Sequence, residues 1–364
     1  MKILADREAL HEAVQIVSGI IPTRSTKPIL HNLLLVAGTN GTELLATDLE
    51  LGIRLQVSGV EVLKAGKVLL PCRELLEILR ETSEDRIQVE NKDNKIFLRT
   101  ERSEFNILFE DPEEYPVIPE FGKNDKFTLP AETFLGLANR VTFAVATEAS
   151  RYAINGVLMN IEGKVIKMVG TDGKRMAYAK GKLDSGDQKL NLILSTKGLN
   201  YLPRILGADD KEIEAATHNN QIMFRSSRAT LVSLLVEGQF PNYEDVIPRN
   251  LNAKVDLNKR ALESSLRKAR LMTTDDSRAV RMQFDEGVVT LSSRAPEKGE
   301  SKIQMDVTYK GDALEAGFDP RYMLDGLKVI NAETVRLELR DARSPGVLVD
   351  GKDFLYVIMP ISLT

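Results

Sequence analysis

Hydrophobic and polar positions along this chain repeat the same run of elements three times. Each run opens with a short alternating strand, a polar turn and an amphipathic helix of about four turns. The opening strands start near residues 1, 126 and 254, and the helices predicted after them span residues 7–20, 131–145 and 259–272. A spacing of this size is that of a domain rather than of a solenoid repeat.

The rest of each run also recurs in order. An extended apolar segment comes next, at residues 29–36, 152–161 and 279–284. A strand then leads into a second helix, predicted at residues 73–80, 197–206 and 321–330, with Pro203 expected to kink the middle one. Alternating strands close each run, at residues 86–90, 95–100, 105–109, 212–216, 221–226, 230–236, 334–340, 345–349 and 354–359.

These patterns predict an α+β protein of three repeated domains, each with two helices packed on antiparallel sheets. Proline-containing linkers at residues 114–119 and 241–248 follow the first two runs, which places the domains at residues 1–122, 123–246 and 247–364. A polar turn also recurs inside the runs: Val169–Ala177 is its clearest form, residues 45–51 a weaker copy and Thr290–Arg294 a diverged third. Asp172 and Asp48 in these turns are interpreted as bonding their own backbone.

Composition excludes several classes of function. The 364 residues include one cysteine, Cys72, and three scattered histidines, so an N/S-ligated metal site is not expected. No nucleophile–base pair is evident, and Gly170–Arg175 lacks phosphate-loop spacing. We therefore predict a non-enzyme without cofactor or metal. No run is apolar enough to span a membrane and no signal-peptide core is present, so a cytoplasmic location is expected.

Positive charge gathers on the predicted helices although the net charge is −4. Each second helix carries a basic pair seven residues apart, interpreted as lying at equivalent points: Arg73 with Arg80, Lys197 with Arg204, and Arg321 with Lys328. Lys259, Arg267 and Arg270 follow one side of the third opening helix. One such pair is typical of a solvated helix face, but three favour phosphate contact without sequence readout.

Several motifs in order resemble the bacterial DNA sliding clamp family, the beta subunit of DNA polymerase III, over nearly the whole chain. They are Pro28–Leu35, Thr47–Glu50, Arg151–Gly156, Thr171–Met176, Phe240–Tyr243 and Tyr356–Pro360. The resemblance implies a head-to-tail homodimer whose six domains form a ring around duplex DNA, with helices lining the hole. It also implies a processivity factor that tethers the polymerase III alpha subunit, the clamp loader and repair proteins through short peptides.

Site residues are carried over from this resemblance. It implies sequence-independent DNA contacts at Arg24, Arg73, Lys197 and Arg204, with Arg80 as an addition. The second domain's counterpart of the Arg24 loop reads Glu148-Ala149, where an acidic residue would repel phosphate.

The implied peptide cleft lies beside the junction of domains 2 and 3. It comprises Ile154, Thr171, Gly173, Lys174, Arg175, Met176, Pro241, Val246, Tyr322, Pro345, Met359, Pro360 and Ile361. Without the family, Met176 and Met359 would be interpreted as core. Ser362 and Asp245 depart from basic residues found in relatives, so peptide preference is expected to differ.

The implied ring interface joins Phe105 and Ile107 to Leu271 and Met272, with Arg99 and Arg102 pairing with Glu297 and Glu300. Two other hypotheses make different predictions. An enzyme such as a nucleotidyl transferase requires a carboxylate cluster or nucleophile. A monomeric scaffold requires Phe105, Ile107, Leu271 and Met272 to be buried within one chain.

Overall fold

A computed structural model describes residues 1–92, 95–108, 110–122, 126–148, 152–184, 186 and 188–363. Phe109, at the end of a predicted strand, and Ala149 and Arg151, named above, lie outside these residues. The chain groups into two compact units: residues 1–131 with 197–235, and residues 132–196 with 236–364. These units cut across the second predicted domain, and the domain boundaries themselves stay a prediction.

The first unit contains two sheets whose strand orders are β5-β1-β7-β8-β9 and β10-β15-β16-β17-β4-β3-β2-β6. Its strands are β1 (Lys2–Asp6), β2 (Asn32–Gly38), β3 (Gly41–Thr47), β4 (Leu51–Val57), β5 (Val60–Lys64), β6 (Gly66–Pro71), β7 (Arg86–Lys92), β8 (Lys95–Arg99), β9 (Glu104–Leu108), β10 (Lys126–Pro130), β15 (Glu212–His218), β16 (Gln221–Arg225) and β17 (Ala229–Leu234). Its helices are α1 (Arg7–Ser18), η1 (Pro28–His31), α2 (Cys72–Glu81), η2 (Pro112–Glu114) and η3 (Leu202–Ile205), with most of α4 (Thr196–Tyr201).

The second unit contains the sheets β14-β11-β12-β13-β25-β24-β23-β18 and β21-β20-β19-β22. Its strands are β11 (Gly156–Glu162), β12 (Val165–Thr171), β13 (Arg175–Lys182), β14 (Lys189–Ser195), β18 (Ala253–Asn258), β19 (Val280–Asp285), β20 (Val288–Ala295), β21 (Gly299–Asp306), β22 (Leu314–Phe318), β23 (Thr334–Leu339), β24 (Gly346–Asp350) and β25 (Phe354–Ile358). Its helices are most of α3 (Ala131–Thr142), η4 (Tyr243–Asp245), α5 (Lys259–Arg270) and α6 (Pro320–Lys328).

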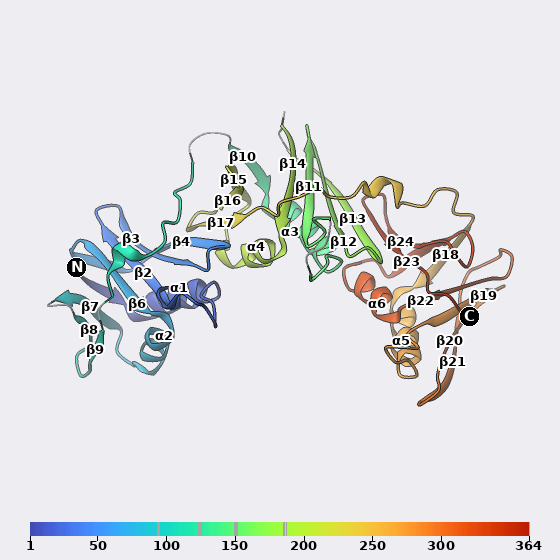
Figure 1. The fold of residues 1–364 in the computed structure, drawn as a ribbon, viewed down its shortest axis with the longest axis horizontal. Coiled ribbons are helices and arrows are strands. Elements are labelled where there is room, and N and C mark those ends of the chain that lie inside the picture. The colour runs from blue at the N-terminus through green and yellow to red at the C-terminus, as the bar shows by residue number, and fades with distance from the viewer. Residues whose placement is uncertain are drawn as a thin grey trace. The chain divides into compact units, whose positions relative to one another are not determined.

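Three of the helices begin at a side-chain cap that the sequence supplies, and the paired helices bury one apolar side. Asp6, Asn258 and Asp319 accept backbone N–H bonds at the starts of α1, α5 and α6, which satisfies donors that a helix leaves unpaired. Figure 1 shows α1 beside α2 and α5 beside α6, and residue contacts join each pair. Their sheet-facing residues, such as Leu75, Leu79 and Leu327, are fully buried.

The register of the strand pairs aligns the three repeats residue by residue. Each opening strand pairs with the first closing strand of its repeat in the same way: Lys2 faces Glu90, Lys126 faces Ala216 and Lys254 faces Glu338. Each eight-stranded sheet joins four strands of one repeat to four of the next, through β4 and β17 in the first unit and through β13 and β25 in the second. The three-fold repeat is therefore confirmed in the fold.

Several element predictions need correction. The segment predicted as extended from residue 29 begins with the 3-10 turn η1, which Pro28 starts. The middle second helix ends at Tyr201 and continues as the 3-10 turn η3 containing Pro203, so the predicted kink is present. Strands β4, β5, β13 and β21 were not predicted; β5, for example, is mostly exposed and lacks a buried alternating face.

Candidate functional site

The turn between β12 and β13 is fixed by its own side chains. Asp172 Oδ1 accepts bonds from the backbone N–H groups of Lys174 and Arg175, at 2.9 and 3.0 Å. Thr171 Oγ1 donates to the Arg175 carbonyl at 2.7 Å and accepts from Gly173 N–H at 3.1 Å. Gly173 has a φ of +83°, a conformation that glycine adopts without penalty. The interpretation of Asp172 as a turn-forming residue is confirmed.

The same turn occurs in the first repeat with a different residue at its strained position. Asp48 Oδ1 accepts from Glu50 N–H and Leu51 N–H, and Thr47 bonds to Leu51 and Leu49 as Thr171 does to Arg175 and Gly173. Leu49 occupies the place of Gly173 and has a φ of +77°. The expected third copy is wrong, because Thr290–Arg294 lies inside the continuous strand β20, which runs on into a hairpin with β21.

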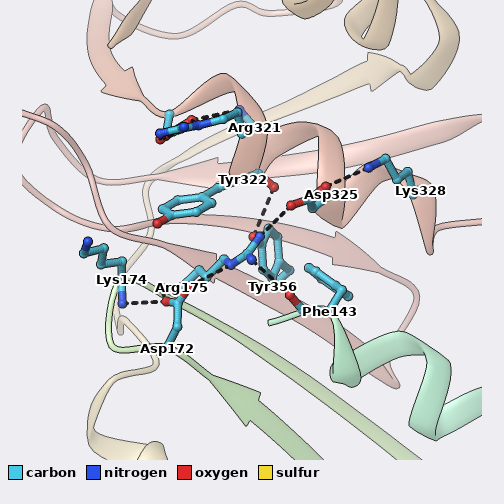
Figure 2. A network of polar contacts seen from close by, with 10 residues as sticks. Phe143, Asp172, Lys174, Arg175, Arg321, Tyr322, Asp325, Lys328 and Tyr356 are labelled. Carbon is cyan, nitrogen blue, oxygen red and sulfur yellow. Dashed lines mark hydrogen bonds and ion pairs between the residues drawn. The ribbon is translucent and has the colours of Figure 1, made fainter. Parts of the chain in front are cut away.

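Arg175, at the end of this turn, is the centre of a polar network (Figure 2). Its guanidinium contacts the carboxylates of Asp172 and Asp325, at 3.0 and 2.8 Å, and donates to the Phe143 carbonyl at 3.0 Å. Only 11% of the Arg175 side chain is exposed. The residue therefore connects the end of α3, the turn and α6, and offers little free surface to a ligand.

Aromatic rings enclose this guanidinium. The Arg175 guanidinium carbon lies 4.4 Å from the centre of the Tyr322 ring, a distance typical of a cation–π contact. Tyr356 is fully buried and donates from its hydroxyl to the Tyr322 carbonyl at 3.0 Å. Burial raises the pKa of the Tyr322 hydroxyl, and the nearby Asp172 raises it further. The bond from Tyr356 to its carbonyl and the packing of its ring on Arg175 together hold Tyr322 in one orientation.

Asp325 is held ionised by this network. Burial opposes its charge, but hydrogen bonds from Lys328 and Arg175 outweigh burial and lower the pKa of the carboxyl below its usual value. Lys328 Nζ lies 2.8 Å from the Asp325 carboxylate. The stabilisation that follows is present at neutral pH and is lost as Asp325 is protonated.

The C-terminal strand β25 lies beside this turn and forms a second wall of the predicted cleft. In β25, Val357 faces Met176 of β13, and Met359 N–H donates to the Lys174 carbonyl at 2.9 Å. Met176 and Val357 belong to an apolar cluster, and the linker residues Phe240, Tyr243 and Ile247 pack against it. Tyr243 stacks on Tyr178 with ring centres 5.9 Å apart. Tyr178 and Tyr243 were not among the predicted cleft residues, although Tyr243 lies in a quoted motif.

The side chains of the predicted cleft residues differ in how far they are exposed to solvent. Met176 is core, at 2% exposure, and Thr171 is also buried, whereas Met359 and Val246 are 43% exposed. Gly173 and Lys174 are exposed at the turn. The remaining members are half-buried: Ile154, Arg175, Pro241, Tyr322, Pro345, Pro360 and Ile361. All of the predicted cleft residues belong to the second unit. The turn, the linker and the C-terminal segment supply most of them, while Tyr322 comes from α6 and Ile154 and Pro345 precede β11 and β24.

The predicted DNA-contacting residues all belong to the first unit. Arg24, Arg73, Arg80 and Arg204 are exposed, and Arg73 and Arg80 contact only Glu77 and Glu81 of their own helix among the described residues. Lys197 is different, because its ammonium group pairs with the carboxylates of both Asp48 and Glu50. The turn of the first repeat therefore neutralises part of the charge on the second repeat's helix.

The three basic pairs begin at equivalent points, as the sequence predicts, but differ in their surroundings. Strand register places Leu70, Leu194 and Phe318 at matching points, so Arg73, Lys197 and Arg321 correspond. Arg204 follows the break at Pro203, and Arg321 is paired with Asp319 and Asp275.

The residues predicted for a ring interface lie at exposed positions. Phe105 and Ile107 are in β9, the edge strand of its sheet, while Glu300 is in β21, the edge strand of another. Leu271 is 67% exposed, and Met272 and Ile107 are partly exposed. Leu108, which is 87% exposed, was missed because its strand alternates only weakly. Arg99 already pairs with Glu90 and Glu104 of its own sheet.

Other kinds of site were also searched for. Within the described ranges, no three His, Cys, Asp or Glu side chains come together as a metal site. Burial raises the pKa of the Cys72 thiol to about 12, with a smaller contribution from Glu74, which makes it a poor nucleophile. Among the same residues, no helix has the length and apolarity needed to cross a membrane.

Comparison with known proteins identifies the class. Family profiles of the DNA polymerase III beta subunit match along the chain: the N-terminal domain at residues 1–119, the central domain at 128–242 and the C-terminal domain at 244–362. The beta sliding clamps of Pseudomonas aeruginosa and of Escherichia coli K12 are each 30% identical over 368 residues, with full coverage of both chains.

Solved structures agree. The DNA polymerase III beta subunit of Pseudomonas aeruginosa matches over both full chains with a TM-score of 0.94 at 28% identity. A clamp from that organism bound to griselimycin matches with a TM-score of 0.93 at 30% identity. The chain belongs to the DNA polymerase III beta subunit family, the beta sliding clamps. It is accordingly a non-catalytic subunit of the replication machinery, and the three-domain clamp prediction is confirmed.

Proposed function

We propose that two copies of this chain close head to tail into a ring around duplex DNA. The observation that carries the proposal is a pair of incomplete sheets. Two eight-stranded sheets join successive repeats, whereas the strands left over form the smaller sheets that end at β9 and at β21. In the repeat alignment β9 corresponds to β17 and β25, and β21 corresponds to β4 and β13. Pairing β9 with β21 of a second copy would make the third sheet of the same kind.

Exposure at matching positions supports this pairing. Phe105 corresponds to Leu231 and Tyr356, both of which are fully buried, yet Phe105 itself is 37% exposed. Its strand presents unpaired backbone groups on one side, a feature that natural proteins usually cover. A monomeric scaffold would bury Phe105 and Leu271 within one chain, which the exposures contradict.

The strand registers at the two junctions within the chain predict which residues face each other at the proposed junction between two copies. Val232 faces Gly52 and Val357 faces Met176 at the two internal junctions. Asn106 corresponds to the two valines, and Glu300 corresponds to Gly52 and Met176, since those residues and Glu300 face Thr47, Thr171 and Arg294. Asn106 of one copy should therefore face Glu300 of the other.

A cross-link tests the ring directly. Antiparallel partners have Cα atoms about 4.5 to 5.5 Å apart, within disulfide range, so Asn106→Cys with Glu300→Cys should link two chains into a covalent dimer. The matched control, Asn106→Cys with Ser301→Cys, shifts one side chain to the other face and should link poorly. Equal yields from both pairs, or none from either, would remove the proposed register. Native Cys72 is buried and should not interfere.

The role of the ring is to keep the polymerase on DNA while sliding. Arg24, Arg73, Arg80, Lys197 and Arg204 are proposed to make weak contacts with phosphates, without sequence readout, in the cytoplasm. Clamp loaded on circular DNA should remain there and leave rapidly once the circle is cut. Equal loss from closed and cut DNA would indicate ordinary electrostatic binding and would reject the topological ring.

The cleft of the second unit is proposed to hold short peptides of the polymerase alpha subunit, the clamp loader and repair proteins. Its Met359 and Val246 are exposed, and its Tyr322 ring packs on the Arg175 guanidinium. Flexible apolar side chains suit varied Leu and Phe residues. Met359→Lys should weaken a Leu/Phe-rich peptide by about tenfold or more. Val117→Lys, in the exposed first linker, is the control, and equal affinities for both variants would exclude this cleft.

A further inference from the structure

A basic pocket of about 250 Å³ lies beside the start of α6 in the second unit. Four cations line it, Arg270, Arg278, Lys298 and Arg321, together with Asp275 and Asp319. They come from the end of α5, the loop after it, the β20–β21 hairpin and the first turn of α6. A water molecule occupies about 30 Å³ in the liquid, so the pocket has room for a charged side chain and solvent.

Both carboxylates in the pocket are already engaged by one arginine. Asp319 is buried, and its two oxygens accept from the Arg321 guanidinium at 2.8 to 3.3 Å. Asp275 contacts the same guanidinium at 3.2 Å. Among the residues that the structure describes, the other three cations have no carboxylate partner.

Those three cations share one hollow. Lys298 Nζ donates to the Thr273 carbonyl at 2.8 Å, and it pairs with no carboxylate of the described residues. Arg270 and Arg278 are exposed, and within the described ranges neither lies within ion-pair distance of a carboxylate. Like charges around a common space repel one another, so an anion placed between them is attracted by all three.

The pocket and the cleft share one wall. Arg321 precedes Tyr322 at the start of α6, and Figure 2 shows both residues leaving this first turn, with Tyr322 beside Arg175. Ile361 N–H donates to the Gly317 carbonyl at 2.8 Å, two residues before Asp319. An extended peptide advances about 3.3 Å per residue, so a chain crossing the cleft reaches the pocket within a few residues.

We propose that this pocket binds acidic side chains flanking the apolar core of a peptide held in the cleft. The inference rests on the proposed peptide-binding function. Carboxylates suit the site because arginine can hold them through two parallel N–H bonds. Asp275 and Asp319, which also line the pocket, disfavour a long run of phosphates, and an isolated acidic side chain therefore fits better than a nucleic-acid backbone.

The test compares two fluorescein-labelled peptides with the same Leu-Leu-Phe core. One carries Glu-Glu-Glu beside the core and the other Gln-Gln-Gln, and each flank is placed before the core in one set and after it in another. Fluorescence anisotropy should show the acidic peptide binding about 5- to 20-fold more tightly for one flank position, as expected for several exposed ion pairs. Sulfate at ionic strength matched with chloride should reduce this ratio.

Substitutions test whether the preference for the acidic peptide depends on the pocket. The double variant Arg278→Gln/Lys298→Gln should abolish most of the preference and leave the Gln-flanked peptide unchanged. Arg281→Gln removes the same type of charge from β19, outside the pocket, and should keep the preference. A ratio near one for the unmodified protein, or one unaltered in the double variant, overturns the proposal.

Two further outcomes separate this inference from other functions. If neither peptide binds, the cleft proposal itself fails. If the double variant reduces self-association or retention on DNA while the peptide ratio is unchanged, the pocket serves a second copy or phosphates, and the inference is wrong.

Discussion

Two related turns carry different residues at the one position where the backbone of each is left-handed. Gly173 adopts this conformation at no steric expense, whereas Leu49 adopts it with a side chain attached. The surrounding bonds from Thr47 and Asp48 hold Leu49 in place. The first repeat therefore carries strain that the second has avoided.

Exchange at these positions should have opposite effects. Leu49→Gly should raise the free energy of unfolding by up to about 1 kcal/mol, since relief of strain outweighs the entropy that glycine adds to the unfolded chain. Gly173→Ala should lower it by about 1 kcal/mol. Urea unfolding at 25 °C measures both, and a destabilised Leu49→Gly protein would contradict the account of strain.

Asp325 should make stability depend on acid. Its pKa is lowered in the folded state, so its contribution is present above the unfolded value near 4 and is lost as pH falls through the folded pKa. Asp325→Asn should lower the free energy of unfolding by about 1 to 3 kcal/mol at pH 7, because Arg175 loses a charged partner. The difference should shrink at pH 3.

The matched control is Asp353→Asn, which removes an exposed carboxylate that pairs with Lys180. It should change stability little at either pH. If the deficit of Asp325→Asn were equal at pH 7 and pH 3, the charge of Asp325 would not be its cause.

At the scale of elements, the contact between a turn and the next repeat's helix recurs with altered chemistry. Asp48 and Glu50 meet Lys197 of α4, whereas Arg175 meets Asp325 of α6. Both contacts lie where one repeat joins the next. Carboxylates beside a lysine proposed to contact DNA weaken its attraction for phosphate, a useful property in a protein that slides.

Removing that carboxylate should strengthen DNA binding. Asp48→Asn keeps the Oδ1 acceptor on which the turn depends and leaves Lys197 with Glu50 as its remaining carboxylate partner. We expect about 2- to 5-fold tighter binding to a linear duplex at low salt and a steeper fall with salt concentration. Glu43→Gln, on β3 and paired with Arg54, is the control, and an unaltered salt dependence in Asp48→Asn would exclude Lys197 as a DNA contact.

The sequence predicted the order of elements better than their contacts. Alternation and caps such as Asp319 placed most helices within two residues, because local patterns determine these features. The burial of Arg175 and the pairing of Lys197 with Asp48 depend on residues far apart in the chain. The resemblance supplied the cleft, which residue patterns alone do not distinguish from core.

At the scale of the whole molecule, the open edges should control assembly. Phe105→Arg places a charge where the matching residues are buried, so it should convert dimers to monomers in analytical ultracentrifugation. Circular dichroism should be unchanged, because Phe105 is exposed within its own chain. Val117→Arg, at a linker residue that is 93% exposed, should remain dimeric. A dimeric Phe105→Arg protein would place the interface elsewhere.

Because the edges of β9 and β21 are uncovered in one chain, completion of the third sheet would depend on the concentration of the protein. Two sheets are finished within each molecule at any dilution, whereas the third would depend on mass action between molecules. At concentrations below the dissociation constant of the dimer, each chain would expose two unpaired sheet edges to which unrelated strands could bind. How much of the protein a cell makes would therefore set the fraction of molecules whose architecture is whole.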